Sequence, residues 1–159
     1  MLIKGLVDED FTNYKKPSMF IIFPSCTLKC DKEAGCSICQ NSSLANEPDI
    51  RIINQKICLR YLSNPITQAI VCGGLEPMDS FEELKSFIFL LRFQYQCNDD
   101  IVIYTGYKEE EIQSYIETLS HYENIIIKCG RYIPNQEPHY DVVLGVKLAS
   151  DNQYARRIS

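Results

Sequence analysis

The chain has 159 residues, of which 45% are hydrophobic, and this length fits one domain with a substantial core. We therefore expect a single domain that spans residues 1–159. The formal net charge of −5 excludes a general basic field. The basic clusters are two pairs, Lys15-Lys16 and Arg156-Arg157, which are too small to predict a nucleic-acid partner.

Apolar runs are short throughout the chain. None approaches the roughly 20 residues that a membrane-spanning helix needs, so we expect no membrane partner. The N-terminal segment lacks the apolar core of a secretory signal, which argues against a secreted disulfide framework even though the chain has 8 cysteines. We therefore expect a cytoplasmic protein with reduced thiols.

Strand-like and helical patterns alternate along the chain, which is the order of a parallel sheet built from βα units. In chain order we predict a strand over residues 19–23, a helix over 52–62, a strand over 68–72, a helix that begins at Ser80, a strand over 100–104, a helix over 108–119, a strand over 124–128 and a last strand over 140–148. Glu83 is predicted to complete a capping box with Ser80. Residues 109–111, all glutamate, are predicted to be a solvated helix face, and residues 131–139 a loop.

Unusual residues follow several of the predicted strands. They are the cysteine loop after residue 23, Gly73-Gly74, Thr105-Gly106 and Gly130. Ligands of parallel α/β sheets bind at the carboxyl ends of the strands. The sequence therefore predicts one ligand-binding rim.

Four cysteines, Cys26, Cys30, Cys36 and Cys39, lie within fourteen residues. Their soft thiolates suit zinc or an iron–sulfur cluster and exclude magnesium and calcium. A structural zinc site stays open, although zinc knuckles are usually a dozen or more residues apart. A ferredoxin-like cluster fits the spacing poorly. The remaining cysteines are predicted to be small buried hydrophobes, namely Cys58, Cys72, Cys97 and Cys129.

Seven segments of the chain resemble the motifs of one family. Cys26-Thr-Leu-Lys-Cys30 and Cys39-Gln-Asn41 resemble the two parts of a C-x3-C-x2-C signature. The others are Asp10-Phe-Thr-Asn13, Gly73-Gly-Leu-Glu-Pro77, Ile103-Tyr-Thr-Gly-Tyr107, and the tail elements Asp141-Val-Val-Leu and Ser150-Asp-Asn-Gln153. Together they resemble the radical S-adenosylmethionine superfamily, and within it most closely the activating proteins of anaerobic ribonucleotide reductases.

This resemblance implies an α/β fold with an incomplete parallel (βα) barrel and one [4Fe-4S] cluster. Cys26, Cys30 and Cys39 are the expected cluster ligands, because three thiolates leave the fourth iron open for S-adenosylmethionine. Cys36 is the doubtful fourth metal ligand, since it lies in an apparent insertion over residues 31–36. The residues expected to bind S-adenosylmethionine are Asn41, Gly73, Gly74, Glu76, Thr105 and Gly106.

The resemblance also implies a function and partners. The expected activity is reductive cleavage of S-adenosylmethionine to generate a glycyl radical on a protein partner, the large subunit of an anaerobic ribonucleotide reductase. The electron would come from a low-potential donor such as flavodoxin or ferredoxin. Two alternatives stay open: a radical enzyme that modifies a peptide or metabolite, and a zinc-stapled interaction module.

Overall fold

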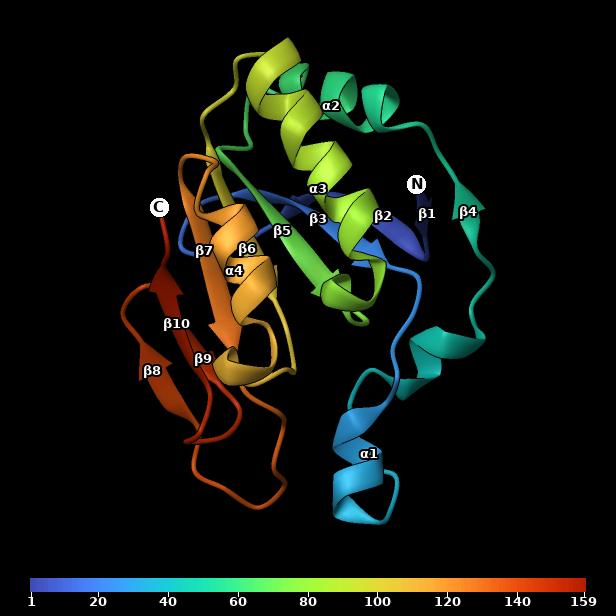
Figure 1. Ribbon diagram of the computed structural model, residues 1–159, viewed down its shortest axis with the longest axis vertical. Coiled ribbons are helices and arrows are strands. Elements are labelled where there is room, and N and C mark those ends of the chain that lie inside the picture. The colour runs from blue at the N-terminus through green and yellow to red at the C-terminus, as the bar shows by residue number, and fades with distance from the viewer.

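The computed structural model describes residues 1–159 and is built on a six-stranded mixed sheet (Figure 1). The order across the sheet is β10 (Tyr154–Arg157), β7 (Ile125–Cys129), β6 (Asp100–Tyr104), β5 (Ala69–Gly74), β3 (Ser18–Phe23) and β2 (Gly5–Asp10). The four central strands are parallel, and β2 and β10 pair antiparallel at the two edges. The predicted α/β class and the predicted central strands agree with this arrangement. The sheet is open at both edges, and the incomplete barrel stays a prediction.

The helices are α1 (Lys29–Ala34), α2 (Asn54–Leu62), α3 (Phe81–Phe89), which a π-helical turn continues over Leu90–Gln94, and α4 (Gln113–Leu119). Two small antiparallel pairs complete the fold: β1 (Leu2–Ile3) with β4 (Ile50–Arg51), and β8 (His139–Asp141) with β9 (Val146–Leu148). Short 3-10 helices lie at Ser42–Asn46, Pro77–Ser80 and Glu109–Glu111. No helix has the length and apolar character needed to cross a bilayer.

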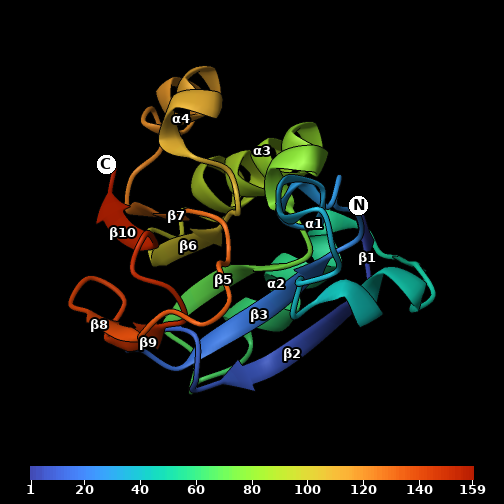
Figure 2. The ribbon, with the colours of Figure 1, turned by 90° about the horizontal axis from the view of Figure 1, so that it is seen from below.

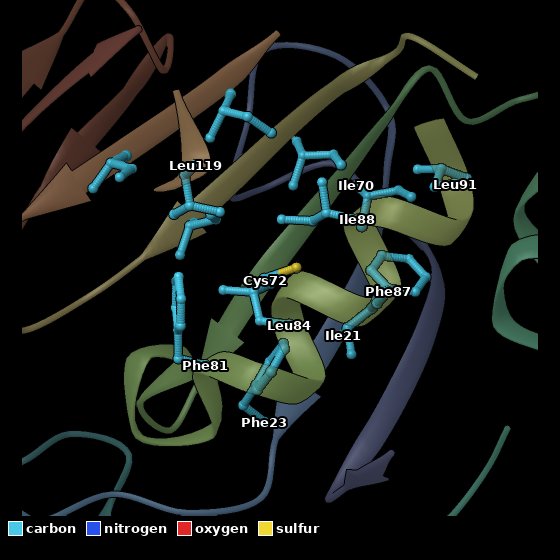
Figure 3. Packing of buried hydrophobic residues seen from close by; sticks show 14 of the residues in the cluster. Ile21, Phe23, Ile70, Cys72, Phe81, Leu84, Phe87, Ile88, Leu91 and Leu119 are labelled. Atoms are coloured by element: carbon cyan, nitrogen blue, oxygen red, sulfur yellow. The ribbon is translucent and has the colours of Figure 1, made fainter. Parts of the chain in front are cut away.

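Helices α2, α3 and α4 supply the core on one face of the sheet. In Figure 3, Leu84, Phe87 and Ile88 of α3 pack against Ile21 and Cys72 of the strands. Fully burying a side chain of this size contributes about 1.5–3 kcal/mol, so this face dominates the stability of the domain. The four isolated cysteines lie in the same cluster, as the sequence predicts.

The opposite face of the sheet is covered differently. A smaller cluster there joins Tyr14, Val71, Val102 and Ile126 to Leu148 of the β8–β9 hairpin. Figure 2, seen from below, shows α3 and α4 on one side of the sheet and this hairpin on the other. Because side chains alternate along a strand, Phe20 in the middle of β3, and Tyr104 and Lys128 near the carboxyl ends of β6 and β7, point to the hairpin side. The arrows of β5 and β7 in Figure 1 point toward α1, so these ends lie next to the cysteine loop.

Two local predictions are wrong. The Ser80 side chain does not cap α3, and the Glu83 carboxylate accepts a hydrogen bond from the Leu2 N–H at 3.1 Å instead. The turn over Pro77–Ser80 precedes the helix, so capping occurs earlier, where the Glu76 carboxylate accepts from the Met78 N–H.

The predicted strand over 140–148 is a hairpin of two short strands. Asp141 Oδ1 accepts from the N–H groups of Val143 and Leu144, each at 2.9 Å, which turns the chain. Gly145 then adopts φ +74°, a conformation that glycine tolerates and that ends the extended run.

Candidate functional site

A cavity of about 400 Å³ opens at the carboxyl ends of β3, β5, β6 and β7, on the hairpin side of the sheet. Its volume is in the range of small-molecule sites. Three of the four loop cysteines line it, Cys26, Cys30 and Cys39, whereas Cys36 is exposed and does not. The other predicted site residues that line it are Asn41, Gly74, Glu76, Thr105 and Gly106. Of the predicted binding residues, Gly73 alone is outside the lining.

The loop that carries Cys26 is fixed by polar contacts from two other segments. Leu28 adopts a left-handed φ of 52°, and its N–H donates to Cys26 Sγ at 3.2 Å. The Asp79 carboxylate accepts from the Thr27 N–H at 2.7 Å and from the Tyr107 hydroxyl at 2.6 Å. The position of Cys26 therefore depends on residues that follow β5 and β6.

The apparent insertion forms a helical detour. Cys30 lies in the first turn of α1, and the helix ends at Gly35, whose φ is +68°. The Asp31 carboxylate then accepts hydrogen bonds from the N–H groups of Ile38 at 2.9 Å and Cys39 at 2.8 Å. These bonds bring Cys39 back to the cavity that Cys30 lines, while Cys36 stays outside.

Ion pairs hold α1 against the rest of the domain. Arg131 bonds Glu111 through two nitrogens, at 2.7 and 2.8 Å, and contacts Glu33 of α1 at 2.9 Å. Lys29 of α1 also reaches Glu111, at 3.2 Å. The hydrogen bonds from Arg131 lower the pKa of Glu111 to about 2. Glu110 and Glu111 are exposed, as predicted for residues 109–111, but Glu111 is also held in this ion network, and the partly buried Glu109 pairs with Arg156.

Glu76 is buried at the junction of two strand ends. Its Oε1 accepts from the Met78 N–H at 3.1 Å and its Oε2 from the Gly106 N–H at 2.8 Å. Burial raises the pKa of this carboxyl to about 7. Both oxygens are engaged by backbone groups, so Glu76 positions the Thr105-Gly106 turn as well as contributing to the cavity wall.

The three glycines predicted to bind the ligand, Gly73, Gly74 and Gly106, differ in how much space surrounds their Cα atoms. A Cβ on Gly74, which has φ +81°, would lie 2.5 Å from Ile22, and a Cβ on Gly73 would lie 3.1 Å from the Phe20 ring. The Gly74 carbonyl accepts from the Asn41 side-chain amide at 2.8 Å. By contrast, a Cβ on Gly106 would lie 3.6 Å from both Cys30 Sγ and Glu76 Oε2. Gly106 thus faces the cysteine side of the cavity, whereas Gly73 and Gly74 allow close packing between strands.

The comparison with protein families matches residues 18–153 to the 4Fe-4S single cluster domain. The chain belongs to this family. The matched range contains all four loop cysteines, and the domain occurs in radical S-adenosylmethionine-type proteins. Comparisons with curated proteins and with solved structures give no match. The 4Fe-4S family favours an iron–sulfur cluster over the structural zinc that the cysteine spacing left open.

The donor set of the cavity fits a 4Fe-4S cluster. Burial raises the pKa of the Cys26 thiol to about 11 and also raises that of Cys30, because a bare thiolate is poorly solvated there. Bound iron would supply the missing positive charge. No three histidine, cysteine or acidic side chains are spaced to hold a single metal ion. A cluster does not require this, since each thiolate binds a different iron.

Lys128 is the residue of this 4Fe-4S domain that sequence reasoning missed. It is 6% exposed, lines the cavity and is the penultimate residue of β7, after three isoleucines. Its Nζ donates to the Gly130 carbonyl at 2.9 Å. The sequence signal for Lys128 was its position as the one charged residue of an apolar strand. Lysine is almost never fully buried without a partner, so a lysine in a buried strand indicates a binding role.

Proposed function

We propose that this 4Fe-4S domain is a radical S-adenosylmethionine enzyme that generates a glycyl radical on a protein partner. The observation that carries the proposal is the shared cavity. Three thiols from one loop line the same 400 Å³ space as Glu76, Thr105 and Gly106, which lie at the ends of two neighbouring parallel strands. A cluster bound to the three thiols would share this cavity with a small organic ligand bound near Glu76, Thr105 and Gly106.

Cys26, Cys30 and Cys39 would hold the cluster through three irons and leave one iron for the ligand. When bound, the cluster and S-adenosylmethionine supply one-electron chemistry, in which the sulfonium is reduced, a carbon–sulfur bond breaks, and methionine and a 5′-deoxyadenosyl radical that abstracts hydrogen are released. The chain itself contributes positioning. Asn41 holds the Gly74 carbonyl, and Glu76 holds the Gly106 N–H.

The proposed partner is the large subunit of an anaerobic ribonucleotide reductase, with a low-potential donor such as flavodoxin or ferredoxin as the electron source. The support is the ordered resemblance from Asp10 to Gln153. Its two ends meet at the cavity, where Thr12, Asn13 and Gln153 all belong to the lining. Segments this far apart in the chain are thus brought together at the place where the chemistry would occur.

Anaerobic reconstitution with iron and sulfide, followed by reduction with S-adenosylmethionine, tests the chemistry. We expect 5′-deoxyadenosine and methionine, and a protein that carries the cluster but releases neither would overturn the radical function. Zinc has no redox chemistry, so a zinc-loaded sample is the control.

The partner is tested by mixing the reduced protein with the reductase subunit. A glycyl radical should appear as an electron paramagnetic resonance doublet and vanish when the radical-site glycine becomes alanine. Cleavage of S-adenosylmethionine without this doublet would instead favour a peptide or metabolite substrate.

A further inference from the structure

Helix α1 carries Cys30, which lines the cavity, yet none of the side chains of this helix is buried. Short helices in proteins owe most of their stability to packing of an apolar face, and α1 has six residues without such a face. A residue in the left-handed region bounds it at each end, Leu28 and Gly35. Figure 1 shows α1 beyond the ends of the strands, apart from the other helices. Its position must therefore come from polar contacts.

The contacts of α1 with the rest of the domain converge on one ion pair, Glu111 with Arg131. The Glu33 carboxylate of α1 contacts Arg131 at 2.9 Å. Lys29 of α1 reaches Glu111 at 3.2 Å, and its Nζ lies 4.3 Å from the centre of the Tyr107 ring. Arg131 follows β7 and Glu111 precedes α4, so neither belongs to the cysteine loop. The pair is the support to which α1 attaches.

Arg131 is the fixed member of this network. Its side chain is 6% exposed, compared with 53% for Glu33. The Arg131 carbonyl accepts a hydrogen bond from the Asn152 side chain at 2.9 Å, which ties the residue to the C-terminal part of the domain. Its Nε is buried without a partner, although an unmatched buried donor is costly. The buried guanidinium is thus an anchor, and the half-exposed Glu33 is the group that can detach from it.

We propose that Arg131 is the positioning residue for Cys30: it latches α1 through Glu33 and so holds this thiol at the cavity for cluster assembly. This inference deepens the proposed function and rests on it in taking Cys30 as a cluster ligand. Cys26 does not depend on this latch, because the Asp79 carboxylate fixes its loop. Loss of the latch should therefore release Cys30 and spare Cys26.

The test measures the rate at which iodoacetamide alkylates each cysteine of the metal-free protein, resolved by mass spectrometry. The chain supplies its own references, because Cys36 is exposed and marks full reactivity, whereas Cys58 and Cys72 are 0% exposed and react only on unfolding. In Arg131→Met we expect alkylation of Cys30 to accelerate on the order of tenfold, the lower end of the range for a hydrogen bond to a charged group. The rate at the Cys26 thiol should stay unchanged.

The electrostatic effect of the substitution has the opposite sign. Alkylation requires the thiolate. Burial raises the pKa of the Cys30 thiol, and the positive charge of Arg131 opposes part of this increase. Removing that charge alone would disfavour the thiolate and slow the reaction. An accelerated reaction therefore reports release of the thiol from its buried position.

A second variant breaks the latch from its exposed end. Glu33→Gln leaves the buried guanidinium and its bonds to Glu111 in place, and it should accelerate alkylation of Cys30 on the order of threefold, as expected for a half-exposed ion pair. Combining it with Arg131→Met should add nothing, because both changes remove the same contact. Arg156→Met is the matched control: it breaks the ion pair with Glu109, which does not contact α1, and should leave the Cys30 rate unchanged.

The cluster is tested in the same variants. After anaerobic reconstitution, Arg131→Met and Glu33→Gln should hold less iron and sulfide per chain than the unaltered protein and Arg156→Met. Normal cluster content in a protein whose Cys30 is released would show that the latch does not serve assembly.

Other outcomes overturn the inference. An unchanged Cys30 rate in both latch variants would show that α1 stays docked without the contact, and equal acceleration of Cys26 would show that the whole loop loosens. If Arg131→Met also exposes Cys58 or Cys72, that variant has unfolded and Glu33→Gln decides. The alkylation result does not require a cluster, so an unaltered protein that binds the cluster without cleaving S-adenosylmethionine would overturn the proposed function and leave the latch standing.

Discussion

The carboxylate of Asp31 accepts a 2.8 Å hydrogen bond from the backbone N–H of Cys39, eight positions further along the chain. A second bond, from Ile38, reaches the same oxygen. Asp31 thereby closes the detour between the second and third cavity cysteines. The four thiols are close in sequence, but this carboxylate decides which of them meet.

Replacing Asp31 tests whether the closure matters for cluster assembly. Asp31→Ala should destabilise the closed loop by about 2 kcal/mol, because a hydrogen bond to a charged group is worth about 1.5–3 kcal/mol and the two bonds share one partly exposed oxygen. We expect less iron and sulfide per chain after reconstitution. Asp31→Asn keeps an oxygen acceptor and is the matched control, with a smaller loss. Equal iron content in the alanine variant and the unaltered protein would show that the cysteines converge without this bond.

Serine substitutions test the ligand assignment. Changing Cys26, Cys30 or Cys39 to serine should abolish the iron–sulfur absorption and S-adenosylmethionine cleavage, because serine is a poor ligand for this iron. Cys36→Ser should preserve most of both, since Cys36 is exposed and outside the cavity. An inactive Cys36 variant alongside an active Cys39 variant would show that the detour itself supplies the third ligand.

Two glycines allow crowding of the cavity to be separated from damage to the fold. Gly106→Ala adds a methyl group 3.6 Å from Cys30 Sγ, in ordinary contact, so we expect a normal melting temperature and normal iron content. Affinity for S-adenosylmethionine should fall on the order of tenfold, which corresponds to about 1.4 kcal/mol.

Gly74→Ala is the comparison. Its Cβ would lie 2.5 Å from Ile22 at a φ of +81°, so this variant should have a lower melting temperature and lose iron and ligand binding together. A stable Gly74 variant with selective loss of ligand binding would assign Gly74 to the ligand site rather than to strand packing.

The Glu111 ion network gives a pH dependence with a defined sign. The pKa of Glu111 is lowered to about 2 in the folded protein, chiefly by Arg131, from an ordinary value of 4.5. Its contribution to stability is therefore complete above pH 4.5 and is lost as the pH falls toward 2. In urea unfolding of the metal-free protein, the stability difference between the unaltered protein and Glu111→Gln should shrink as the pH decreases over this interval.

Glu110→Gln is the matched control for this experiment, because Glu110 has no hydrogen-bond or ion-pair partner. It should show no such pH-dependent difference. A Glu111 difference that stays constant with pH would mean that the side chain contributes through packing alone.

Much of this protein was determined by local sequence. Apolar runs rich in β-branched residues gave the four parallel strands, and β6 coincides with the predicted range of residues 100–104. The carboxyl ends of adjacent parallel strands lie at one edge of a sheet, so the cysteine loop, Gly73-Gly74 and Thr105-Gly106 could be assigned to one rim from the sequence. These features depend on periodicity and chain direction, which a single sequence records.

Tertiary structure decided what long-range contacts control. The capping role of Glu76, the ion network from Arg131 to α1 and the closure by Asp31 each join groups whose pairing has no local pattern. The resemblance left Cys36 as a doubtful fourth ligand, and the folded detour leaves this thiol exposed while the other three line the cavity. The sequence shows Lys128 as one charged residue in an apolar strand, but its burial without a counter-ion was decided by the tertiary structure, because a strand pattern does not show what lies opposite a residue across a cavity.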